Sequence, residues 1–266
     1  MSDFIYPSIS DDRWESIWNE KSYGKIEAEI VGQQQEWARS KRPETTDGWL
    51  PRHLYKFKSV DLASPERTTK IFLNQTLWVS SLEELNDPLE TAFVVPHGSA
   101  GEPIAKGMNH FFNTRWNGYV CLTEDPVCPQ MWAHYAASHS GYCIAYRRSD
   151  SLLLCSTECR RIRYRPTPPV IDDGNVRNPD VADQIFWTKF DNWEYEREWR
   201  LRYPRASAYL PDGLLVPEGI IFGLRTSEGS MALLRSCAKN VRFGRIVPVE
   251  SSPYDLQVKW ESARAK

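Results

Sequence analysis

The stretch W-E-Y-E-R-E-W-R-L-R-Y at residues 193–203 separates into two sets when every second residue is taken. One set is aromatic or aliphatic except for Arg197, and the other is charged throughout. An alternation of this kind predicts a β-strand whose aromatic face is anchored in a core. The charged set is Glu194, Glu196, Glu198, Arg200 and Arg202. Three carboxylates in a row repel one another unless cations neutralise them, so this face is either solvated and ion-paired or lines a cleft.

The rest of the chain alternates short strand patterns with a few helical ones. Strands are predicted at residues 54–58, 76–80, 119–122, 142–146, 160–164, 219–223, 241–248 and 256–260. Helices are predicted at residues 67–73, from 130 to near Gly141, at 180–190 and at 227–240. This pattern predicts an α+β fold with a central, mostly antiparallel twisted sheet flanked by helices.

The N-terminal part is predicted to be separate from this domain. Asp12 and Glu15 have the spacing of a capping box, and Trp14 begins an apolar stripe of helical spacing. A polar run containing Pro43 and Gly48 follows. We therefore expect a helical appendage and linker over residues 1–48 and a single α+β domain over residues 49–266.

Composition limits the class of protein. The net charge is -2 and the pI is near 6.2, which argues against a surface that is basic throughout. No apolar run approaches the roughly 20 residues that span a bilayer, and no secretion signal is visible. Six cysteines without regular spacing are typical of reduced thiols. These features predict a cytoplasmic protein with no membrane partner.

Signatures of metal and phosphate sites are missing from the sequence. His134 and His139 have cysteines near them, but the chain has no C-x-x-C pair, so no metal site is expected. Neither a G-x-G-x-x-G fingerprint, a P-loop lysine motif nor a G-x-S-x-G elbow is present. His134 is predicted to be packed, whereas Tyr135 can either pack or reach a ligand with its hydroxyl.

Five short motifs occur along the chain in an order that is also found in one known protein family. They are Leu54-Tyr-Lys-Phe-Lys58, Asn86-Asp-Pro-Leu-Glu90, Met131-Trp-Ala-His-Tyr135, Ser140-Gly-Tyr-Cys-Ile144 and Glu196-Arg-Glu-Trp-Arg200. The set resembles the bacterial family named domain of unknown function 2971, over roughly residues 50–260. The Asn-Asp-Pro segment by itself predicts a capped loop.

A more distant resemblance is to ADP-ribosyltransferases. It implies that Lys56 or Lys58 on the first strand holds NAD, that Ser80 shapes the nicotinamide pocket, and that Glu198 stabilises an oxocarbenium-like transition state. Arg200 would keep Glu198 ionised, and Glu196 would orient or deprotonate an acceptor. The first strand departs from those enzymes, because it offers lysines in place of arginine or histidine, although Arg52 and His53 are close in sequence.

The resemblance implies an NAD-dependent ADP-ribosyltransferase or NAD glycohydrolase of a bacterial toxin, effector or defence type. Its partners would be NAD or a related nucleotide and a protein or nucleic-acid acceptor. Two alternatives stay open, a non-catalytic nucleotide- or nucleic-acid-binding module and a magnesium-dependent nuclease using Asp87, Glu90, Glu196 and Glu198. We expect Lys56, Asn86, Tyr135 and Glu198 to converge on one cleft, with Glu198 mattering more to activity than to folding.

Overall fold

The computed structural model describes residues 51–261, apart from residues 64, 97–105, 109, 111, 113–117, 156–158, 176–178, 204 and 239. The helical appendage and linker predicted for residues 1–48 lie outside the described residues. No helix in the described part of the chain is long and apolar enough to cross a membrane.

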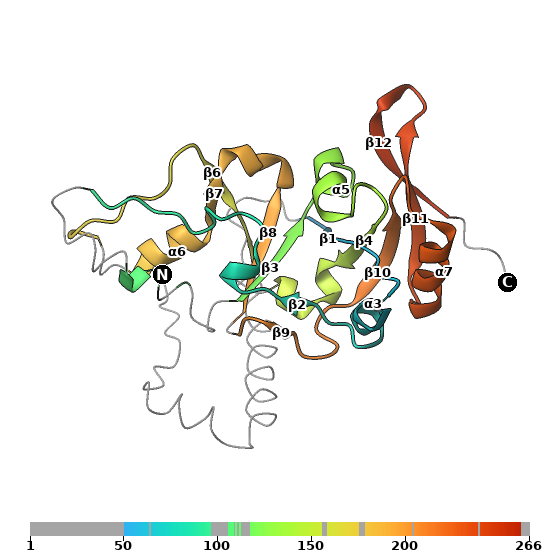
Figure 1. The fold of residues 1–266 in the computed structure, drawn as a ribbon, viewed down its shortest axis with the longest axis horizontal. Coiled ribbons are helices and arrows are strands. Elements are labelled where there is room, and N and C mark those ends of the chain that lie inside the picture. The colour runs from blue at the N-terminus through green and yellow to red at the C-terminus, as the bar shows by residue number, and fades with distance from the viewer. Residues whose placement is uncertain are drawn as a thin grey trace, which may run out of the picture. The chain divides into compact units, whose positions relative to one another are not determined.

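An eight-stranded sheet forms the centre of the fold, with the order β12-β11-β10-β4-β1-β3-β8-β5 (Figure 1). Its strands are β1 (His53–Lys58), β3 (Gly118–Thr123), β4 (Tyr142–Arg147), β5 (Cys159–Arg161), β8 (Glu198–Tyr203), β10 (Pro217–Phe222), β11 (Arg242–Val249) and β12 (Ser252–Trp260). Each neighbouring pair is antiparallel except β10 with β11. The predicted α+β class with a mostly antiparallel central sheet is therefore confirmed.

Two small sheets, four helices with defined bounds and a short helical stretch at residues 106–108 complete the described part. The small sheets pair β2 (Trp78–Val79) with β9 (Ala208–Tyr209) and β6 (Arg163–Arg165) with β7 (Thr188–Phe190). The helices are α3 (Pro65–Leu73), α5 (Pro129–Tyr135), α6 (Pro179–Phe186) and α7 (Glu228–Cys237). The 3-10 turns are η1 (Leu82–Glu84), η2 (Arg148–Asp150), η3 (Leu152–Cys155) and η4 (Asp191–Glu196).

Helices cover both faces of the central sheet. On one face, the fully buried ring of Trp132 in α5 meets Phe57 edge-on with ring centroids 4.9 Å apart. On the other face, the guanidinium of Arg235 in α7 lies 5.0 Å from the ring centroid of Phe222. A second core, under β3 and α6, includes Tyr119 stacked on Phe186. Because both faces are covered, the central strand β4 is buried at every position from Tyr142 to Tyr146.

The central sheet is weakest between β1 and β3. β1 pairs with β4 along its whole length, but the register between β1 and β3 consists of the single pair Tyr55 and Thr123. Next to that pair, the Lys56 ammonium donates a hydrogen bond of 2.7 Å to the carbonyl oxygen of Cys121 in β3. The two halves of the sheet are therefore joined here by a single residue pair and one side-chain hydrogen bond.

The strand predicted at residues 193–203 is only partly correct. Residues Asp191–Glu196 form the 3-10 turn η4, Arg197 adopts a left-handed conformation with φ 43°, and β8 begins at Glu198. The turn is accompanied by a hydrogen bond of 2.7 Å from Lys189 to Glu196, seven residues later, which a continuous extended strand could not make. The charged face is not solvated either, because Glu198 and Arg200 are buried.

Several other predicted elements end differently in the structure; the helix predicted from residue 130 to near Gly141, for example, ends at Tyr135. The helix predicted at residues 180–190 ends at Phe186, and the chain then extends as β7, which carries Lys189. The strand predicted at 160–164 is divided at Ile162 into β5 and β6. Ile162 donates its amide to the carbonyl of Glu198 over 2.9 Å, so β8 supports the chain at this break.

Candidate functional site

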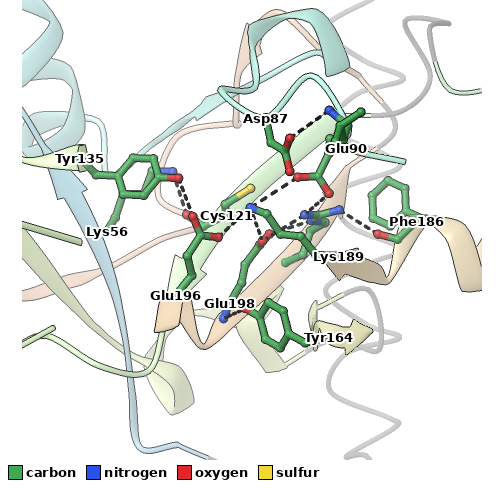
Figure 2. Close-up of polar contacts among 12 residues, drawn as sticks. Lys56, Asp87, Glu90, Cys121, Tyr135, Tyr164, Phe186, Lys189, Glu196 and Glu198 are labelled. Carbon is green, nitrogen blue, oxygen red and sulfur yellow. Dashed lines mark hydrogen bonds and ion pairs between the residues drawn. The ribbon is translucent and has the colours of Figure 1, made fainter. Parts of the chain in front are cut away.

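Five charged residues from distant parts of the chain form one buried cluster beside β8 (Figure 2). We call Glu90, Lys189, Glu196, Glu198 and Arg200 the ion network. The ammonium of Lys189 lies 2.7 Å from a carboxylate oxygen of Glu196 and 3.5 Å from one oxygen each of Glu90 and Glu198. One lysine from β7 therefore faces all three carboxylates.

Arg200 holds the inner side of the ion network and is completely buried. Its guanidinium donates to both carboxylate oxygens of Glu198, at 2.7 and 3.0 Å, and to Glu90 at 2.7 Å. Its remaining terminal nitrogen donates to the carbonyl of Phe186 at 2.8 Å. Such bidentate, charge-assisted hydrogen bonds fix both partners, so the side chain of Glu198 is held rigidly.

The pKa values of Glu196 and Glu198 are shifted in opposite directions. Burial raises the pKa of Glu198, but Arg200 and Lys189 outweigh it and hold that pKa well below its usual range. Burial also lowers the pKa of Lys189, but the three carboxylates outweigh it and raise that pKa. The pKa of Glu196 is raised, because burial and the charge of Glu198 exceed the stabilisation that Lys189 supplies. A carboxylate whose pKa is raised is the better proton acceptor of the two.

Tyr135 connects the ion network to the surface. Its hydroxyl donates to Glu196 over 2.5 Å and is hydrogen-bonded to the side chain of Asn86. Tyr135 is half-buried and Asn86 is exposed. Burial and the neighbouring carboxylate of Glu196 raise the pKa of the Tyr135 phenol, so it stays a protonated donor at neutral pH.

The Asn86-Asp87-Pro88 segment is the turn that carries Glu90 into the cluster. The Asp87 carboxylate accepts a hydrogen bond from the amide of Leu89 at 2.9 Å, and its carbonyl accepts from the amide of Glu90 at 3.1 Å. The predicted capped loop is confirmed. The second carboxylate oxygen of Asp87 is buried and has no hydrogen-bond partner among the described residues, which is costly in a protein interior.

Three aromatic side chains lie where Tyr135 and Glu196 approach the surface, and we call them the aromatic rim. The ring of Tyr195 is 6.2 Å from that of His134 and 6.0 Å from that of Trp193. The Lys189 ammonium lies 4.8 Å from the Trp193 ring centroid. Trp193 and Tyr195 are half-buried, and His134 is exposed rather than packed as predicted. The rim therefore offers ring faces beside a carboxylate.

The structure brings together most of the residues that the sequence singled out. Tyr135, Asn86, Glu196, Glu198 and Arg200 are joined by the contacts above. Lys56 lies beside them through its bond to Cys121, whose thiol is hydrogen-bonded to Glu198. The predicted convergence on one region therefore holds for these side chains, although Glu198 lies beneath the surface and lines no open cleft.

Ser80 and Lys58 are placed apart from the ion network. Ser80 pairs through its backbone with Tyr119, and the described residues show no contact between its side chain and the ion network. Lys58, at the end of β1, forms no ion pair with any described residue. Burial and the charges of Lys56 and Arg67 lower its pKa to about 8.

Sequence reasoning missed Lys189, the residue that joins the three carboxylates. It lay inside the predicted helix at 180–190, between Thr188 and Phe190. The available signal was its surroundings, because a single lysine in the run Phe186-Trp-Thr-Lys-Phe190 is poorly placed for a solvated helix face. Buried lysines require a paired carboxylate, and that requirement pointed toward Glu196 and Glu198.

Comparisons with known proteins bear on the same segment. Residues 131–201 match the family model described as Protein of unknown function (DUF2971), which supports the resemblance to that family from α5 to β8. No curated protein and no solved structure matches the chain. The comparisons lend no support to the resemblance to ADP-ribosyltransferases, which remains an expectation from the sequence.

Proposed function

We propose that this protein binds NAD and breaks the bond between its ribose and nicotinamide, as an ADP-ribosyltransferase or NAD glycohydrolase. The observation that supports this most directly is the meeting of Glu196, Tyr135 and the aromatic rim. Nicotinamide in NAD is a positively charged ring, which is attracted both by carboxylates and by aromatic faces. The resemblance stated above adds a bacterial toxin, effector or defence role to the proposal.

The charge of the region is complementary to such a ligand. The ion network contains three carboxylates and two cations, so it leaves excess negative charge close to the aromatic rim. On β1, Lys58 has no ion-pair partner among the described residues, and Lys56 lies between β1 and β3. In the proposal Lys56 faces the pyrophosphate, while Tyr135 and Glu196 face the nicotinamide riboside; Lys58 is placed apart from the ion network.

Glu196 is a better candidate than Glu198 for the carboxylate that acts on the ligand. Both oxygens of Glu198 are bound by Arg200, and its side chain is 2% exposed. Glu196 is bonded on one side to Lys189 and on the other to Tyr135, which itself reaches the surface. We therefore assign Glu196 to the reaction and Glu198 to positioning, as the partner that fixes Lys189 and Arg200.

The proposed reaction balances with the groups at hand. The bond from ribose C1′ to the nicotinamide nitrogen breaks, and its electron pair returns to that nitrogen and neutralises the ring. Positive charge develops on the ribose, where a nearby carboxylate stabilises it. A hydroxyl of the acceptor, or water, forms the new bond to C1′ and gives its proton to Glu196.

The test is nicotinamide release from NAD, measured by chromatography with water alone, with bacterial protein and with nucleic acid as acceptor. Glu196→Gln should lower turnover at least about 100-fold, a barrier change of a few kcal/mol. The matched control is Glu194→Gln, because Glu194 is exposed on the same turn. NAD should still raise the melting temperature of Glu196→Gln, which separates loss of chemistry from loss of binding.

Two results would overturn the proposal. If NAD neither raises the melting temperature of the wild type nor is consumed with any acceptor, the chain is better described as a binding module for another ligand. If the protein instead cleaves nucleic acid and this cleavage depends on added Mg²⁺, the nuclease alternative replaces the proposal. In the structure, however, a magnesium ion would have to displace Lys189 and Arg200 from the carboxylates.

A further inference from the structure

A small pocket opens beside the ion network, between the Asn-Asp-Pro turn and the segment that follows β6. Its enclosed volume is about 10 Å³, room for about one water molecule and far below the range of about 300–1,000 Å³ typical of sites for small organic ligands. Its walls are Leu89, Ala92, Arg165, Thr167, Pro168, Pro169, Thr188, Lys189 and Phe190. A depression of this size holds no dinucleotide, and a partner's side chain can only rest against its walls.

The charged part of the pocket is positive. Arg165 lies on its wall and is exposed, and neither Arg165 nor Arg163 forms an ion pair with any described residue. The intervening Tyr164 points inward, since its hydroxyl accepts a hydrogen bond of 2.7 Å from the amide of Glu198. Alternation along β6 therefore turns Arg163 and Arg165 to the outside together, about 7 Å apart.

The apolar part of the pocket continues onto the surface. Leu89 is 57% exposed, and Val94 and Val170 are 46% and 51% exposed. The two valines are held in a β-bridge, because Val94 donates to the carbonyl of Pro169 at 2.9 Å and accepts from the amide of Ile171 at 2.8 Å. Exposed aliphatic side chains fixed in this way beside unpaired arginines are typical of an interaction surface.

We infer that this surface binds an acidic, extended segment of a partner protein, with aliphatic side chains of that segment packed against Leu89, Val94 and Val170. In an extended peptide, side chains two residues apart lie about 7 Å apart on the same side, which matches the spacing of Arg163 and Arg165. Carboxylates at those positions would each meet a guanidinium, the pairing that arginine favours.

The lining of the pocket favours a peptide over nucleic acid. Single-stranded nucleic acid binds mainly by stacking bases on aromatic side chains. Here Phe190 is the one aromatic residue among the described pocket walls, and the others are aliphatic, proline, threonine or basic. Leucine or valine can pack against such a surface, and threonine hydroxyls can bind the peptide backbone. This inference does not rest on the proposed reaction, although the pocket shares Lys189 with the ion network.

The experiment measures binding of a fluorescein-labelled peptide of alternating glutamate and leucine by fluorescence anisotropy. The wild type should bind it saturably, and more weakly as salt is raised. Arg165→Glu should weaken binding at least about tenfold, and Leu89→Asp should also weaken it. The matched control is Arg245→Glu on β11, a similarly exposed arginine that faces Glu228 and Glu261, and it should change binding less than about twofold.

A second peptide shows whether the Arg165→Glu variant is folded. A lysine–leucine peptide of the same length should bind Arg165→Glu better than it binds the wild type, which an unfolded variant could not produce. The inference is wrong if the acidic peptide does not bind the wild type, or if Arg165→Glu and Arg245→Glu behave alike. Tighter, Arg165-dependent binding of a single-stranded oligonucleotide would assign the surface to nucleic acid instead.

Discussion

The Tyr135 hydroxyl donates a hydrogen bond of 2.5 Å to Glu196, so α5 is tied directly to the turn that precedes β8. The other oxygen of the same carboxylate accepts from Lys189 at 2.7 Å. Glu196 is thus held between a neutral donor near the surface and a buried cation, and its orientation depends on both.

Removing the Tyr135 hydroxyl tests this relationship. Tyr135→Phe keeps the ring but leaves one oxygen of a buried carboxylate without its donor, so the free energy of unfolding should fall by about 1.5–3 kcal/mol. Urea denaturation followed by circular dichroism measures the change. Tyr195→Phe is the control, because it removes a hydroxyl from the neighbouring aromatic rim. An equal loss in the two variants would mean that the bond to Glu196 contributes little.

Replacing Glu198 should affect folding first. The sequence alone led to the expectation that this residue matters more to activity than to stability, but both its oxygens are bound by buried Arg200. Glu198→Gln leaves that guanidinium without its full counter-charge, and the free energy of unfolding should fall by about 3–5 kcal/mol. Glu194→Gln, at an exposed position, should change it by less than about 0.5 kcal/mol. A Glu198→Gln variant as stable as the wild type would contradict this assignment.

Lys58 should make stability rise with pH in the alkaline range. Its pKa is lowered from 10.5 to about 8, so between these values the unfolded chain binds the proton more tightly than the folded chain does. Stability therefore increases as pH rises from about 8 to 10.5. Lys58→Met should stabilise the protein at pH 7, and the gain should shrink toward pH 10.5. Denaturant titrations at several pH values measure it, with Lys259→Met on β12 as an exposed control. A gain that does not depend on pH would point to packing instead.

Glu218 should contribute stability that is lost in acid. Burial raises its pKa, but hydrogen bonds from Arg147 and His53 outweigh this and lower the pKa from 4.5 to about 2. The stabilisation is therefore present above pH 4.5 and disappears as pH falls toward 2. Thermal unfolding of Glu218→Gln should show a weaker loss of stability over that interval than the wild type. Glu250→Gln, an exposed change, should follow the wild-type curve.

The strands and helices could be predicted from sequence wherever their signal is local. Residues 54–58 and 142–146 alternate or are uniformly apolar, and each lies within a strand of the structure, paired in register from His53 with Arg147 to Lys58 with Tyr142. The order of strands was not predictable, because the neighbours of β1 are set by contacts between distant segments. The same holds for the division of the sheet at Tyr55 and Thr123.

The candidate site could be predicted only in part. Tyr135, Asn86 and the Glu196-x-Glu198 pair were found from their motifs, and they are joined in one region by hydrogen bonds. Period-two alternation placed Glu196 in a strand, whereas it lies in a turn, because the bond to Lys189 prevails over the local strand preference. The burial of Glu198 depends on Arg200, Glu90 and α6 together. Contacts between such distant segments cannot be predicted from a local sequence pattern.

The ion pair between Arg200 and Glu90 also limits how early this part of the protein can fold during synthesis. The two residues are 110 positions apart, so at about 5–20 residues per second Glu90 is synthesised roughly 5–20 seconds before its arginine. Until then its carboxylate must stay in water, and the layer between β3 and α6 cannot close. Nascent chains arrested before residue 189 should be cleaved by protease near Glu90, whereas chains extended until β8 has emerged should be protected. The layer around Glu90 can therefore fold only after the last third of the sequence has been synthesised.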